Sequence, residues 1–180
     1  MDNLLKGKVL VLLSGGIDST ACVEYYVSRA YSVSALFVDY GQPYMTQEKA
    51  AATAIAKYYH IPLGEIKISG FSISEGYIPA RNSILLNLAL LCFGQESGIV
   101  AIGIHAGTPY ADCSPDFANL MQQIYDLYEE GRIRIDAPFL QWTKNEIWEH
   151  AKIQKIPLHM THSTNLNDLV PLAEQPGSDQ

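Results

Sequence analysis

The stretch that decides the fold is Val9-Leu10-Val11-Leu12-Leu13, followed without a break by Ser14-Gly15-Gly16-Ile17-Asp18-Ser19. An uninterrupted apolar run of this length predicts a β-strand buried on both faces, as in a parallel sheet. The glycine pair predicts a tight turn, and residues 18–30 predict a helix opened by Asp18 or Ser19, residue types that cap helix N-termini. A buried strand, a glycine turn and a helix in this order indicate an α/β domain.

The alternation of strand and helix continues along the chain. Apolar runs predict strands at 33–38, 65–68, 99–104 and 133–135, and helical periodicity predicts helices at 46–59, 82–96, 115–130 and 143–154. Thr143 and Glu146 have the spacing of a capping box, and the apolar circumference of the 82–96 helix predicts packing against the sheet. We expect an α/β fold, a doubly wound, Rossmann-like parallel sheet with helices on both faces, over residues 1–163, and a short irregular tail over 164–180.

The composition is that of a folded globular protein, with 48% hydrophobic and 17% charged residues. The net charge of −7 and the small number of Lys and Arg residues, 12, argue against a nucleic-acid partner. The three cysteines show no Cys-x-x-Cys pairing, which favours a reducing compartment. No secretion signal and no apolar run of about 18 residues is visible, so we expect a cytoplasmic protein with no membrane partner.

The glycine turn has the chemistry of an anion site. Gly15 and Gly16 allow the backbone to approach a phosphate, and the hydroxyls of Ser14 and Ser19 can donate to its oxygens near a positive helix end. Asp18 is too negative to face phosphate alone, so its expected partner is a magnesium ion, which takes oxygen ligands. The alternative is a structural glycine turn capped by Ser and Asp.

Several motifs occur in order over about residues 8–163. They are Leu12-Leu13-Ser14-Gly15-Gly16-Ile17-Asp18-Ser19-Thr20, Asp39-Tyr40-Gly41-Gln42, Tyr77-Ile78-Pro79-Ala80-Arg81-Asn82, Gly103-Ile104-His105, Tyr110-Ala111-Asp112-Cys113, Pro115-Asp116-Phe117 and Trp142-Thr143-Lys144-Asn145-Glu146-Ile147. The first resembles the pyrophosphatase loop of the N-type ATP pyrophosphatases. The whole set resembles the 7-cyano-7-deazaguanine synthase family of the queuosine pathway.

The resemblance implies an ATP-dependent, AMP-forming ligase that converts 7-carboxy-7-deazaguanine and ammonia to the nitrile, with ATP and magnesium as cofactors. It implies an ATP site at Ser14, Gly15, Gly16, Asp18 and Ser19, with adenine beside the backbone of Leu36, Phe37 and Val38. Lys144, Arg81 and Asp18 are the expected catalytic residues, the two basic ones acting on pyrophosphate or the substrate carboxylate.

Arg81, Asn82, His105, Tyr110 and Asp112 are the expected substrate-binding residues. A carboxylate suits the guanine-like edge because it can accept from both the ring N–H and the exocyclic amine, which favours Asp112. The alternative for Asp112 is a cap in the turn Asp-Cys-Ser-Pro. For His105 the alternative is a purely structural histidine.

The chain departs from the family in one respect. Members usually end with four cysteines that bind a structural zinc, whereas this chain has Thr161-His162-Ser163-Thr164 and no cysteine after Cys113. His159 and His162 are half a zinc site, so we expect no zinc.

The missing zinc module leaves other functions open. A relative of this kind could couple the adenylated deazaguanine carboxylate to another amine, such as a protein N-terminus. Sulfur transfer or amidation of another nucleobase, and a nucleotide-sensing module without turnover, are the remaining alternatives. The apolar 82–96 helix would tolerate a homodimer contact.

Overall fold

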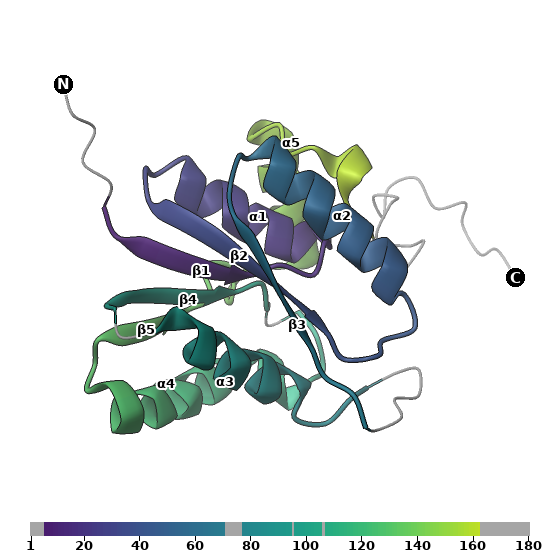
Figure 1. Ribbon diagram of the computed structural model, residues 1–180. Coiled ribbons are helices and arrows are strands. Elements are labelled where there is room, and N and C mark those ends of the chain that lie inside the picture. Colours follow the sequence, from purple (N-terminus) through teal and green to yellow (C-terminus); the bar gives the residue numbers. More distant parts are fainter. Residues whose placement is uncertain (1–5, 71–76, 95, 106, 163–180) are drawn as a thin grey trace, which may run out of the picture.

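The computed structural model describes residues 6–70, 77–94, 96–105 and 107–162. Within them one parallel sheet has the strand order β3-β2-β1-β4-β5 (Figure 1). The strands are β1 (Lys8–Leu12), β2 (Ser32–Asp39), β3 (Leu63–Lys67), β4 (Gly98–Ile102) and β5 (Ile133–Asp136). The central strand is β1, whose Leu12 pairs with Leu36 of β2 and with Ile102 of β4. The expected doubly wound parallel sheet is confirmed.

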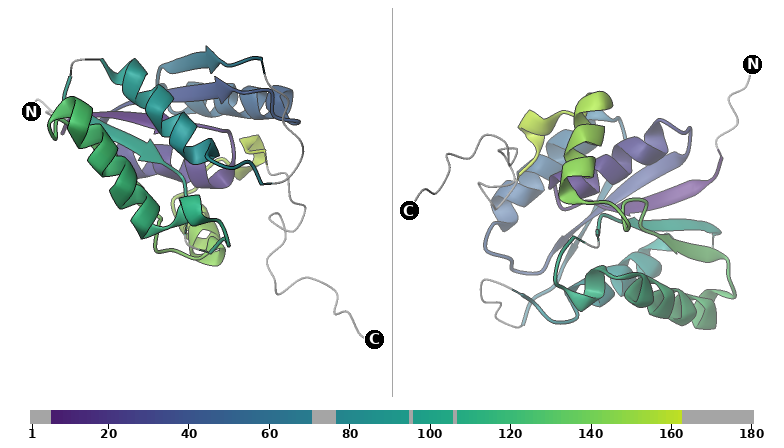
Figure 2. Two further views of the ribbon diagram at one scale, coloured as in Figure 1. Left: turned by 90° about the horizontal axis from the view of Figure 1, so that it is seen from below. Right: turned by 180° about the vertical axis from the view of Figure 1, so that it is seen from behind.

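Helices cover both faces of the sheet. They are α1 (Ile17–Val27), α2 (Met45–Tyr58), α3 (Arg81–Phe93), α4 (Pro115–Glu129) and α5 (Lys144–Ile153), with short 3₁₀ turns η1 (Ala111–Cys113) and η2 (Leu158–Met160). One face carries α1, α2 and α5, and the other carries α3 and α4 (Figures 1 and 2). None of the described helices is long and apolar enough to cross a bilayer.

The two faces have separate cores because side chains alternate along each strand. Val9 and Val11 of β1 point into the core under α1, α2 and α5. Leu10 and Leu12 point into the core under α3 and α4. The uninterrupted apolar run of β1 therefore reflects burial on both sides, as predicted.

One expectation about the helices is wrong. The helix after the glycine turn begins at Ile17 with Gly16 as its N-cap, so neither Asp18 nor Ser19 caps it. Ser19 instead donates its hydroxyl back to the Gly16 carbonyl at 3.0 Å. The helix α3 packs on the sheet through Leu86, as predicted, while its Leu91 is 80% exposed.

The capping box of α5 is confirmed. The Thr143 hydroxyl oxygen accepts from the Glu146 backbone N–H at 3.3 Å, and the Glu146 carboxylate accepts from the Thr143 N–H at 2.7 Å. The hydrogen bonds that the Glu146 carboxylate accepts from the Thr143 N–H and the Thr143 hydroxyl lower the pKa of Glu146. The box fixes where α5 begins, and so fixes the position of Lys144, its first residue.

Candidate active site

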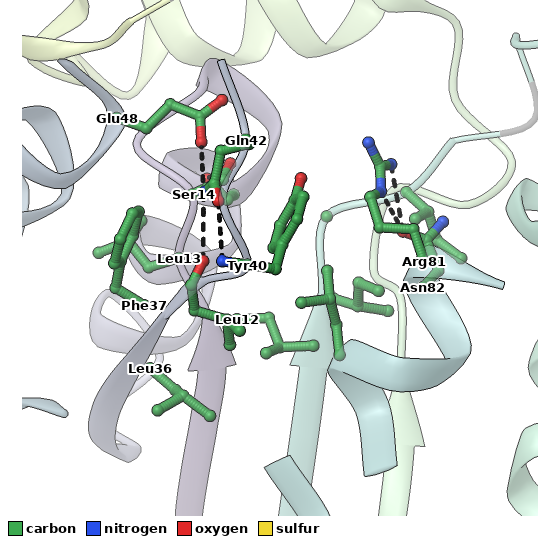
Figure 3. A pocket seen from close by; sticks show the side chains of 16 residues that line it. Leu12, Leu13, Ser14, Leu36, Phe37, Tyr40, Gln42, Glu48, Arg81 and Asn82 are labelled. Atoms are coloured by element: carbon green, nitrogen blue, oxygen red, sulfur yellow. Dashed lines mark hydrogen bonds between the residues drawn. The ribbon is translucent and has the colours of Figure 1, made fainter. Parts of the chain in front are cut away.

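A cavity of about 170 Å³ opens at the carboxyl ends of β1, β2 and β4 (Figure 3). The chain passes from β1 outward to β2 and β3, and then returns to the other side of β1 to form β4. The carboxyl ends of β1 and β4 are therefore the switch point of the sheet, where ligands of such folds bind. The lining residues are Leu12, Leu13, Ser14, Ser19, Leu36, Phe37, Val38, Tyr40, Gln42, Glu48, Arg81, Asn82, Leu85, Ile102, Gly103 and Ile104.

The segment Ser14–Ser19, which we call the phosphate loop, follows β1 and includes the first residues of α1. The hydroxyls of Ser14 and Ser19 are 3.2 Å apart, and both residues line the cavity. The Gly16 amide also reaches Ser14 Oγ, at 3.4 Å. Because the first amides of a helix lack partners inside the helix, the start of α1 presents donors and a positive dipole end to an anion.

Close packing holds this loop in place. Gly15 has a φ of +86°, and a Cβ on it would lie 2.7 Å from the Glu48 carbonyl oxygen and 2.8 Å from the Ala51 Cβ. A Cβ on Gly103, at the end of β4, would lie 2.7 Å from the Ser19 backbone nitrogen. Glycine is therefore needed at both positions, and it brings α2 and β4 against the loop.

Asp18 and Lys144 form an ion pair beside the loop, although they are far apart in sequence. Lys144 Nζ donates to both Asp18 oxygens, at 3.0 and 2.8 Å, and the two side chains are 29% and 24% exposed. The structure thus brings two of the expected catalytic residues together. Neither of them lines the cavity.

The end of β2 forms the wall of the cavity opposite Arg81. Leu36, Phe37 and Val38 line it, in the region expected for adenine. The Leu36 carbonyl accepts from the Leu13 N–H at 2.9 Å, and the Val38 carbonyl accepts from Gln42 Nε2 at 3.1 Å. Each carbonyl oxygen keeps a second lone pair.

Residues 39–42, which include the end of β2 and the turn after it, contribute cavity residues to which the sequence analysis assigned no role. Tyr40 and Gln42 line the cavity together with Glu48 of α2. Gln42 Nε2 donates to Glu48 Oε2 at 2.9 Å, and Gln42 Oε1 accepts from the Tyr40 N–H at 2.9 Å. The signal was the place of this motif directly after a buried strand, since such turns lie at the ligand-binding edge of a parallel sheet.

The opposite wall is lined by Arg81 and Asn82. We call these two residues, together with the neighbouring Tyr110 and Asp112, the α3 side. Arg81 Nε and Nη2 both donate to Asn82 Oδ1 at 3.2 Å. Asp112 is buried; its Oδ2 accepts from the Asn82 N–H at 3.4 Å, and its carbonyl accepts from Asn82 Nδ2 at 3.0 Å. Asp112 therefore caps α3 from η1, and Asn82 connects it to the cavity.

Tyr110 and His105 lie outside the cavity lining. The Tyr110 ring stacks on Tyr77, with centroids 5.1 Å apart and an interplanar angle of 10°, and the two residues are 42% and 51% exposed. His105 is buried, and its Nδ1 accepts from the Gly107 N–H at 3.2 Å. That contact is consistent with the structural alternative, and the substrate-binding role expected for His105 stays a prediction.

The last described residues pack on the phosphate loop. The His162 N–H donates to the Gly15 carbonyl at 2.9 Å, and its ring lies 5.7 Å from that of Tyr44. His162 Nε2 is buried without a hydrogen-bond partner in the described part of the chain. No group of three or more His, Cys, Asp or Glu residues among those described could hold a metal ion. The absence of zinc stays a prediction, which elemental analysis of untagged protein checks.

Sequence comparison identifies the relatives of this chain. A family model described as "Queuosine biosynthesis protein QueC" matches residues 8–74 and 64–168. A 7-cyano-7-deazaguanine synthase from Desulfitobacterium hafniense is 31% identical, with 87% of this chain and 78% of the relative covered. A protein of the same name from Prochlorococcus marinus is 30% identical, with 89% and 84% covered.

Solved structures share the fold at low sequence identity. A U34-tRNA thiolase from Methanococcus maripaludis has a TM-score of 0.59 at 18% identity, with 92% of this chain and 62% of the thiolase covered. An NMN synthetase from Francisella tularensis has a TM-score of 0.56 at 19% identity, with 94% and 70% covered. At these identities the likeness shows the fold alone.

The relatives are named as synthases, which confirms the expectation of a ligase-type enzyme. The motifs on which the resemblance rested lie inside the matched residues. With more than half of its length matched by the family model, the chain belongs to the family of the queuosine biosynthesis protein QueC.

Proposed function

We propose that this enzyme adenylates the carboxylate of 7-carboxy-7-deazaguanine with ATP, releases pyrophosphate, and uses ammonia to displace AMP and form the amide. A second ATP then adenylates the amide oxygen, which leaves with AMP as 7-cyano-7-deazaguanine forms. The observation that carries the proposal is the cavity at the switch point. It joins the phosphate loop, through Ser14 and Ser19, to Arg81 and Asn82 on the α3 side. The family membership supports this choice of substrate.

The phosphate loop and the end of β2 would bind ATP. The amides of Gly15 and Gly16 and the hydroxyls of Ser14 and Ser19 would hold the phosphates, with adenine against Leu36, Phe37 and Val38. The loop lacks the Gly-x-x-x-x-Gly-Lys-Ser/Thr pattern of enzymes that cleave between the β- and γ-phosphates. We therefore propose AMP and pyrophosphate as the nucleotide products.

Residues on the α3 side would bind the deazaguanine. Arg81 can hold its carboxylate through a bidentate fork, while Asp112 and Asn82 would read the guanine-like edge, with Tyr110 beside it. Asp112 already accepts one hydrogen bond from Asn82, but a carboxylate has about four acceptor sites and can take more. Binding ATP at the phosphate loop and the deazaguanine at the α3 side would align the carboxylate with the α-phosphate, which is the main task of an adenylating enzyme.

Magnesium fits Asp18, since this ion usually binds proteins through one or two carboxylates and takes its other oxygens from phosphates and water. When bound it would neutralise charge on the departing pyrophosphate. Lys144, which now shares both oxygens of Asp18, would then be freed to face the same phosphates.

The experiment is incubation with 7-carboxy-7-deazaguanine, ATP, magnesium and ammonia, followed by chromatography of the nucleotides and mass spectrometry of the base. We expect AMP, pyrophosphate and the nitrile. ADP as the main substrate-dependent product would contradict the proposal. An unconverted amide, or a conjugate that forms only with a larger amine, would contradict the final step while retaining adenylation.

A further inference from the structure

The turn at residues 39–42 holds its own backbone through polar side chains. Asp39 Oδ1 accepts from the Gly41 N–H at 3.0 Å, and Gln42 bonds to the Tyr40 N–H and the Val38 carbonyl. Asp39 and Gln42 are both buried, at 4% and 7% exposure. These side chains are occupied in fixing the turn, so they present Tyr40 on a rigid support.

Tyr40 is the residue of this turn whose side chain stands in the middle of the cavity. In Figure 3 its ring lies between the phosphate loop at Ser14 and the α3 side at Arg81 and Asn82, with the hydroxyl pointing away from the sheet. The ring packs on the core beneath α3, which limits its movement. The hydroxyl therefore occupies the space where the two substrates would meet.

The surroundings keep this hydroxyl protonated at neutral pH. Burial raises the pKa of Tyr40 above its ordinary value, and the neighbouring Arg81 guanidinium lowers it only in part. A neutral tyrosine can donate one hydrogen bond.

On this geometry, and resting on the proposed function, we infer that Tyr40 is a catalytic residue whose hydroxyl donates a hydrogen bond to an oxygen of the α-phosphate as the acyl-adenylate forms. In that step a carboxylate oxygen forms a bond to the α-phosphorus. The bond from the α-phosphorus to the bridging oxygen breaks, and its electron pair leaves with pyrophosphate. No proton is transferred, so Tyr40 stays neutral, and the hydrogen bond stabilises charge on the phosphate in the transition state.

The test compares the wild type with Tyr40→Phe, which keeps the ring and removes the hydroxyl. Tyr58→Phe is the matched control, because Tyr58 is 48% exposed at the end of α2 and lies outside the cavity lining. The measurement is exchange of labelled pyrophosphate into ATP that depends on 7-carboxy-7-deazaguanine, together with ATP affinity and melting temperature. Removing one such donor in other enzymes lowers kcat by about 10²-fold, and we expect a loss of this order for Tyr40→Phe with ATP affinity and melting temperature retained. Tyr58→Phe should match the wild type.

Three outcomes would overturn the inference. Exchange by Tyr40→Phe that equals the wild type would show that the hydroxyl is not used. A loss confined to ATP affinity would make Tyr40 a ground-state binding residue. A fall in melting temperature that accounts for the lost activity would make it structural. If the wild type itself shows no substrate-dependent exchange, the proposed function fails, which is a distinguishable result.

Discussion

The two walls of the cavity are constructed in different ways. The phosphate loop is backbone packed against backbone, with no room for a Cβ at Gly15 or Gly103. The α3 side depends on hydrogen bonds made by side chains, such as Arg81 to Asn82 Oδ1 and Asn82 Nδ2 to the Asp112 carbonyl, and it ends in the half-exposed stack of Tyr77 and Tyr110. Backbone geometry suits a ligand part common to many reactions, which on the proposed function is phosphate, whereas side chains can change to suit one substrate.

This contrast has a consequence for substitutions. Substitutions in the phosphate loop should lower both the rate of every reaction step and the stability of the fold. Changes on the α3 side should act on the affinity for the deazaguanine and leave ATP binding intact.

The largest effect is expected from Gly15→Ala, with Gly131→Ala as its matched control. Both glycines have a positive φ, +86° and +78°, but no atom lies within 4 Å of a Cβ built on Gly131. Gly131→Ala should cost about 1 kcal/mol of unfolding free energy from backbone strain alone. Gly15→Ala adds overpacking of about 1–3 kcal/mol and should abolish ATP binding. Urea denaturation measures the stability loss, and titration measures the ATP affinity. Equal losses in the two variants would show that close packing at Gly15 is not the cause.

Asp18→Asn should lower turnover by about 10²-fold or more while changing stability little, because an ion pair that is still partly exposed to solvent contributes only on the order of 1 kcal/mol. Lys144→Met and the double variant complete a cycle. We expect the activity losses to be strongly non-additive, since both residues serve the same phosphates. Steady-state kinetics and thermal melts supply the data. A stability loss as large as the activity loss would assign the pair to the fold.

Asp112→Asn should weaken binding of 7-carboxy-7-deazaguanine by about 10- to 100-fold and spare ATP, because an amide offers one acceptor where two donors must be paired. The cap on α3 survives in this variant, since an amide oxygen can still accept from the Asn82 N–H. Calorimetric titration of each ligand separately is the measurement. Equal weakening for both ligands would take Asp112 out of base recognition.

The smallest effect concerns the contact between His162 and the loop. His162→Pro removes the N–H that donates a hydrogen bond to the Gly15 carbonyl. It should lower the free energy of unfolding by about 1 kcal/mol and weaken ATP binding several-fold. Thr161 is already extended, with φ −79° and ψ 149°, so it tolerates a following proline. His162→Ala keeps the N–H and is the control. If the alanine variant loses as much ATP affinity as the proline variant, the ring rather than the amide supports the loop.

Local patterns were enough to predict most of the fold. The buried strand, the glycine turn and the capping box at Thr143 depend on neighbouring residues, so the sequence contains them directly. The pairing of Lys144 with Asp18 and the capping of α3 by Asp112 connect distant segments, and no local pattern records them. The direction of Tyr40 likewise depends on how Asp39 and Gln42 fix the turn after β2, and no local pattern indicates it.

The bond from the His162 N–H to the Gly15 carbonyl also bears on how the protein is made. Synthesis begins at the N-terminus, so β1 and the phosphate loop leave the ribosome long before η2 does. Until β4 has been made, β1 can pair with β2 alone. Contacts between such distant segments form late in folding because the intervening chain must be ordered first. A nascent chain that stops short of His162 would have its first strands and helices but an unsupported loop. On the proposed function, competence to hold ATP would be acquired only once the chain has been made as far as His162.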